Sequence, residues 1–170
     1  MSQQTSGHLQ LLKDRLQAIH EGELPYGDRN PLAATWLVPD VVSFLLEHGR
    51  QMTPSRVVMN GGLWMRCEET ALQLATFYPD ELVPYFGFRL FDEGGLVWFA
   101  LSWCMEVGAE EQTIIDPSWI TDAPMLYFGV PWCRELYERI PRRQGAASKT
   151  VTELPPVLAR SLFDLLPRCA

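Results

Sequence analysis

The chain has no run of about eighteen apolar residues, so the sequence predicts no membrane span. Its first residues, 1–6, lack the basic and apolar regions of a secretory signal, and we therefore expect a cytoplasmic protein. The four cysteines form no CxxC pair and no Cys/His cluster with zinc spacing, so we expect neither a metal nor a cofactor. In that compartment all four are expected to be reduced thiols, with Cys104 and Cys133 as packing residues.

Basic residues are also scarce, since 14 Lys and Arg stand against 21 Asp and Glu and give a net charge of −7. Binding to a phosphate backbone requires clustered basic side chains. The sequence clusters them near one loop only: Arg134, Arg139, Arg142 and Arg143. We expect no direct nucleic-acid partner. An acidic surface suits solubility or a basic protein partner.

The remaining composition is that of an ordinary globular protein, with 47% hydrophobic and 21% charged residues. A length of 170 residues favours one domain with one core over residues 1–170. Within it we expect a helical subregion over 1–78, a sheet subregion over 83–130 and C-terminal helices over 131–170.

Three helices are predicted in the first part of the chain. Residues 7–21 carry leucine and isoleucine at helical spacing. A second helix begins at Pro39, since proline suits the first helical position, and ends before Gly49. Residues 50–65 are expected to be irregular, and the third helix runs from about 67 to 77.

Aromatic and β-branched residues then predict strands. Residues 83–91 and 96–107 flank Asp92-Glu93-Gly94-Gly95 and indicate a β-hairpin. Further strands are expected over 112–116 and 125–130, then a helix opened by Pro131 and a last helix over 156–166. Helices, an antiparallel meander of three to five strands packed on the helix of Cys67, and further helices make an α+β fold.

The candidate chemistry lies in Cys67 and Asp116. A helix N-terminus lowers the pKa of a cysteine, because its free N–H groups and dipole favour the thiolate. A base must then take the proton, and a third group must orient that base. Leu101 and Asp116 are expected to lie side by side on adjoining strands, but leucine can neither accept nor donate a proton. The chain's histidines all precede Cys67: His8, His20 and His48.

Several motifs occur in order between about residues 58 and 130. They are Gly61-Gly62, Cys67 to Ala71, Tyr85-Phe86-Gly87-Phe88, Leu101-Ser102-Trp103, Asp116-Pro117-Ser118-Trp119 and Tyr127-Phe128-Gly129-Val130-Pro131. This part of the chain resembles a bacterial and phage group within the papain-like/transglutaminase-like cysteine hydrolase superfamily. The resemblance implies that fold, with Cys67 at the nucleophile position and Asp116 as the aspartate that orients the base. The chain departs from the group at Thr70, where an asparagine is expected, and at Leu101, where the histidine is expected.

Other site candidates each have a plain alternative. Asn60 could support an oxyanion hole, or it is a turn residue before Gly61. Trp64 and Trp103 are candidate cleft residues, and Trp103 fits a core position equally well. Cys104 should face away from Leu101 because side chains alternate along a strand. Cys67 alone also fits a buried helix start, and Asp-Pro after a strand is a common turn start.

Three functions follow from these observations. The first is a catalytically impaired papain/transglutaminase-like domain that binds a macromolecule as an inhibitor, adaptor or regulatory protein. The second is an active cysteine amidase, peptidase or acyltransferase, with a thioester at Cys67 and Asp116 acting directly or through water. The third is an unrelated protein-binding module.

Overall fold

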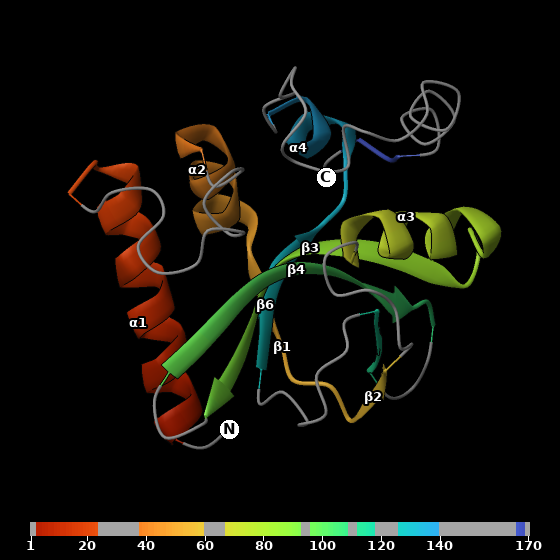
Figure 1. The fold of residues 1–170 in the computed structure, drawn as a ribbon, viewed down its shortest axis with the longest axis horizontal. Helices are drawn as coiled ribbons and strands as arrows, with labels where there is room; N and C mark the ends of the chain where they lie inside the picture. Colours follow the sequence, from red (N-terminus) through yellow and green to blue (C-terminus); the bar gives the residue numbers. More distant parts are fainter. Residues whose placement is uncertain are drawn as a thin grey trace.

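The computed structural model describes residues 3–23, 38–59, 67–92, 96–108, 112–117, 126–139 and 166–168. Two N-terminal helices lie on one side of a six-stranded sheet, a third helix packs on the long strands, and a short helix follows the last strand (Figure 1). This is the α+β class that the sequence predicts. Among the described helices, none is both long and apolar enough to cross a membrane.

The first two helices form where the sequence predicts them. Helix α1 spans Gln3–His20, a few residues longer than expected, and Gly22 follows it with φ of 77°. Helix α2 spans Pro39–His48 with proline in its first turn. The Gly49 N–H donates to the Leu45 carbonyl oxygen at 2.9 Å and closes the last turn.

The predicted hairpin is also confirmed. Strand β3 (Leu82–Asp92) pairs antiparallel with β4 (Leu96–Glu106) along its whole length. Strands β5 (Thr113–Asp116) and β6 (Leu126–Pro131) occur where the third and fourth strands are expected.

The segment predicted to be irregular instead contributes two strands, β1 (Arg50–Met52) and β2 (Arg56–Met59). The sheet order is β1-β6-β3-β4-β5-β2, so it is not a meander, and β2 pairs with β5 in parallel. The sequence-based prediction of an all-antiparallel sheet confined to 83–130 is therefore wrong. Such short edge strands carry too few residues for an alternation signal, and their partners lie far away in the sequence.

The C-terminal part differs from expectation at Pro131. This residue ends β6, and helix α4 (Arg134–Arg139) begins three residues later. The helix expected over 156–166 lies outside the described residues, apart from position 166. Cys133 is disulfide-bonded, so the expectation of four reduced thiols is wrong, whereas Cys67 and Cys104 are free and buried.

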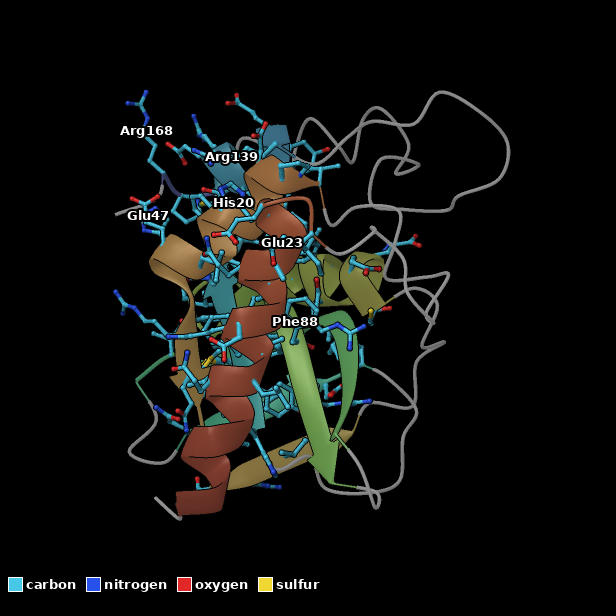
Figure 2. All side chains as sticks on the ribbon, turned by 90° about the vertical axis from the view of Figure 1, so that its left-hand side faces the viewer. His20, Glu23, Glu47, Phe88, Arg139 and Arg168 are labelled. Carbon is cyan, nitrogen blue, oxygen red and sulfur yellow. The ribbon has the colours of Figure 1, made fainter. Side chains whose placement is uncertain are left out.

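Side chains of the sheet alternate between two faces. The outer face carries Phe86, Phe88, Phe128 and Val130, which pack against Leu12, Leu16, Val41 and Leu45 of α1 and α2 in the main core. Figure 2 shows Phe88 behind α1 and His20 towards the end of that helix. The opposite, inner face carries a second cluster: Met52, Leu101, Trp103, Ile114 and Tyr127, together with Cys67.

Candidate functional site

Cys67 is the first residue of helix α3 (Cys67–Phe77), as the sequence predicts. Its side chain is 4% exposed and packs with Leu101 and Trp103 of the inner face. The helix itself lies on β3 and β4 (Figure 1). Ala71, one turn further on, packs against Cys104 on the other face of β4, and the Cys104 thiol donates to the Ala71 carbonyl oxygen at 3.1 Å.

The environment of Cys67 favours the thiol over the thiolate. Burial raises the pKa of Cys67 well above its usual range, and the charge of Glu68 raises it further. A hydrogen bond with the Ser102 backbone lowers the pKa, and the charge of Asp116 raises it again. Desolvation therefore outweighs the helix N-terminus that the sequence suggested as an activating influence.

Asp116 ends β5 with a fully buried carboxylate that accepts hydrogen bonds from Arg89 and Tyr127. The guanidinium of Arg89 on β3 donates from Nη1 to Asp116 Oδ2, and both side chains have no exposed surface. The Tyr127 hydroxyl on β6 donates to the same oxygen at 2.9 Å. The charge of the carboxylate is thus balanced by an arginine within the protein interior.

These contacts require the sheet to curl around its inner face. Strands β3 and β4 stand between β6 and β5 in the sheet, so in a flat sheet Tyr127 and Asp116 would be about 14 Å apart at the usual strand spacing. A tyrosine side chain cannot bridge that gap. The hydrogen bond between Tyr127 and Asp116 is made because β5 bends back towards β6 and encloses Arg89.

Leu101 lies near the position that the sequence predicts, but two residues along β4 from the point opposite Asp116. Strand β4 pairs with β5 at Cys104↔Ile115 and Met105↔Ile114. The same register continued by one residue sets Trp103 opposite Asp116, and Leu101 becomes its diagonal neighbour on the inner face. Cys104 faces the other way and packs with Ala71 and Leu82, as the alternation predicts.

Trp103 is a core residue of the inner face and is fully buried. Its ring lies 5.0 Å from the Tyr127 ring and 6.0 Å from the Tyr85 ring, between centroids. A Cβ atom built at Gly129 would lie 2.7 Å from Trp103 Cη2. Glycine at this position is what allows the indole to lie against β6.

No histidine reaches the inner face. His8 and His20 belong to α1 and His48 to α2, and both helices pack on the outer face. The His48 ring instead lies against Phe44, with 4.6 Å between the centroids. Asn60 and Trp64, the candidate oxyanion and cleft residues, lie outside the described residues. Within the described part of the chain, no three His, Cys, Asp or Glu side chains are grouped to hold a metal.

Arg89 and Tyr127 were not predicted as site residues from the sequence. A signal for Arg89 was present, because a charged residue stands in the apolar strand segment from Tyr85 to Phe91, where burial requires a counter-charge. Together with Asp116 these residues form a buried polar cluster on the sheet face against which Cys67 packs. No family model, curated protein or solved structure matches this chain.

Proposed function

We propose that this chain is a catalytically impaired papain- or transglutaminase-like domain that acts by binding another macromolecule, as an inhibitor, adaptor or regulatory protein. One observation carries the proposal. The Asp116 carboxylate, whose charge raises the pKa of Cys67, accepts hydrogen bonds from Arg89 and Tyr127, while Leu101 stands where the resemblance implies a histidine.

Cysteine catalysis requires a thiolate and a group that moves its proton. The raised pKa of Cys67 opposes the first requirement. The second is opposed because Leu101 carries no proton-accepting atom and the three histidines belong to helices on the outer face. An aspartate that is already paired with an arginine has little capacity left to orient an imidazole.

An active cysteine hydrolase or acyltransferase is the second candidate. It is favoured by the place of Cys67 at the N-terminus of α3. A catalytic thiolate would have to form against burial and against the negative charges of Glu68 and Asp116. This candidate therefore predicts a thiol reactivity that the first one does not.

Site-resolved alkylation distinguishes the two. The folded protein is treated with iodoacetamide at pH 7.4, and the label on each cysteine is followed by mass spectrometry. Cys104 is the matched control, since it is also a free, buried thiol but packs on the outer face of β4. We expect Cys67 to react no faster than Cys104. We also expect it to react at least ~tenfold more slowly than in the unfolded chain, because each pKa unit by which the pKa of the thiol is raised lowers the thiolate fraction tenfold.

Selective alkylation of Cys67, with a rate that levels off below pH 7, would overturn the proposal and favour the enzyme. In that case Cys67→Ala would abolish activity. For a binding protein the same substitution leaves function intact.

A further inference from the structure

Large apolar side chains are exposed together at one end of the molecule. Phe77 is 76% exposed, Tyr78 49% and Val107 53%, and they make up most of the large exposed apolar side chains among the described residues. Phe77 ends α3, Tyr78 starts the turn into β3, and Val107 follows β4. Figure 1 shows the end of α3, the start of β3 and the end of β4 on the same side of the molecule.

Backbone hydrogen bonds hold these three residues in one place. The Val107 N–H donates to the Glu81 carbonyl oxygen at 2.8 Å, and the Glu81 N–H donates to the Tyr78 carbonyl oxygen at 3.2 Å. Leu82 is buried beneath, and its N–H donates to the Tyr78 carbonyl oxygen at 2.9 Å. The exposed apolar groups therefore stand on a fixed base, which lowers the entropy cost of binding.

Carboxylates adjoin the apolar residues in the same turn and strand end. Asp80, Glu81 and Glu106 are all exposed, and Glu106 is the strand partner of Leu82. The sequence from 67 to 133 contains a single Lys or Arg, Arg89, and that residue is buried against Asp116. It contains eleven Asp and Glu. Residues 67–133 therefore provide no exposed Lys or Arg to compensate the negative charge of Asp80, Glu81 and Glu106.

We propose that Phe77, Tyr78 and Val107, with Asp80, Glu81 and Glu106 around them, form the docking surface for a partner-protein segment that carries apolar anchors flanked by Lys or Arg. Interfaces place aromatic side chains at their centre and charged residues at their rim, and complementary charge sets partner choice and association rate. A surface with an apolar centre and an acidic rim complements a segment that has an apolar centre and basic flanks. The inference deepens the proposed binding function and gives it a surface away from Cys67.

The test uses a twelve-residue synthetic peptide in which Lys alternates with Leu and Phe. Two matched peptides replace every Lys by Glu, or every Leu and Phe by Ser. Binding to the full chain is followed through backbone amide shifts in NMR spectra. We expect saturable shifts centred on Tyr78, Glu81 and Val107 with the first peptide only, and an affinity that falls as salt is raised.

Three variants complete the test. Phe77→Ser/Val107→Ser and Glu81→Lys/Glu106→Lys should each weaken the binding by at least tenfold. Leu11→Ser is the matched control, because Leu11 is also 53% exposed but lies on α1, and it should leave binding unchanged. Circular dichroism of each variant verifies that it is folded.

Other outcomes overturn the inference. Equal binding of the peptide without Leu and Phe, or shifts spread over the whole acidic surface, would indicate unspecific charge attraction. Self-association of the free chain that Phe77→Ser/Val107→Ser abolishes, without peptide binding, would make a second copy of the chain the occupant. If none of the peptides binds, the proposed partner segment with apolar anchors and flanking Lys or Arg is excluded. None of these results depends on the alkylation of Cys67, so the two proposals fail separately.

Discussion

Arg89 and Asp116 pair across the curled sheet with both charged groups fully withdrawn from solvent. Arg89 stands on β3 and Asp116 at the end of β5, so the pair links two strands that are not adjacent. The arginine thereby binds the carboxylate to which the resemblance assigns the orienting role in catalysis. This ion pair occupies the Asp116 carboxylate and so limits what else on the inner face it can bind.

Removal of one partner of this ion pair should destabilise the fold strongly. Asp116→Asn leaves the buried Arg89 guanidinium without its counter-charge, and we expect a loss of about 3–5 kcal/mol in the free energy of unfolding. Arg89→Met/Asp116→Leu, which removes both charges, should regain most of that loss. Denaturant unfolding of the variants measures both effects. Glu106→Gln, at an exposed carboxylate, is the control and should stay within about 0.5 kcal/mol. Equal losses for the single and double variants would contradict the pairing.

A histidine restored at position 101 should not activate the cysteine by itself. In Leu101→His the Asp116 carboxylate remains bound to Arg89 and Tyr127, so it does not orient the new imidazole. Leu101→His/Arg89→Met removes the guanidinium, so the carboxylate can accept a hydrogen bond from the new imidazole in its place while Tyr127 still binds it. We expect the alkylation rate of Cys67 at pH 7 to rise at least ~tenfold in the double variant and little in the single one, an effect of about one pKa unit. The pH profile of alkylation measures it. A strong gain in the single variant would mean that Arg89 does not control Asp116. No gain in either would favour an unrelated binding module.

Stability should fall in alkaline solution because of buried thiols. Burial raises the pKa of Cys104 to about 12 and the pKa of Cys67 well above its usual range. Above about pH 8.5 the unfolded chain loses these protons while the folded chain keeps them, so the unfolded state binds fewer protons and stability decreases as pH rises. The contribution of the two thiols to the free energy of unfolding is fully present below about pH 8.5. It is lost as the pH rises towards the pKa values of the thiols in the folded protein.

Each such thiol should lower the free energy of unfolding by about 1.4 kcal/mol per pH unit within this window. Denaturant unfolding between pH 8 and 11 measures the slope, and thiolate absorbance of the folded protein checks that Cys67 and Cys104 stay protonated. Cys104→Ala should make the slope shallower. A stability that is constant over this range would show that the two thiols are not desolvated.

Gly129 should not tolerate a side chain. A Cβ atom at this position would meet the Phe86 carbonyl oxygen and would lie 2.7 Å from the Trp103 ring, so Gly129→Ala must displace a fully buried indole. We expect a loss of about 1–3 kcal/mol in the free energy of unfolding and a changed near-UV circular dichroism spectrum. Gly7→Ala is the matched control, since nothing lies within 4 Å of a Cβ there. As an alanine within α1, it should stabilise the protein by about 0.5–1 kcal/mol. An unchanged Trp103 signal in Gly129→Ala would contradict this packing.

The sequence predicted the elements whose signals are local. Pro39 and Gly49 mark the ends of α2, and alternating aromatic residues on both sides of Asp92-Glu93-Gly94-Gly95 mark the hairpin. The alternation of Leu101, Trp103 and Cys104 also gave the correct faces of β4.

Elements defined by distant partners were not predicted. Strands β1 and β2 form because their backbone groups pair with those of β6 and β5. Segments of three or four residues are too short to show this pairing in their own sequence pattern. The ion pair of Arg89 with Asp116 likewise depends on the curl of the sheet, which brings together strands that are separated in its order. Of the site, the sequence indicated Cys67, Leu101 and Asp116 but not the arginine that binds the acid.

The parallel pairing of β2 with β5 has a consequence for folding kinetics. The β3–β4 hairpin is local and can form early, but β2 and β5 enclose α3 and the whole hairpin between them in the sequence, so their pairing carries a large loop-closure cost. Asp116 reaches Arg89 only when β5 is in place at the sheet edge. Before β5 is in place, Arg89 on the hairpin has no Asp116 to pair with, and its burial without that carboxylate would be unfavourable. We therefore expect the inner face to become buried only when the edge strands have formed. The ion pair would accordingly form late, and changes in it should act mainly on the unfolding rate.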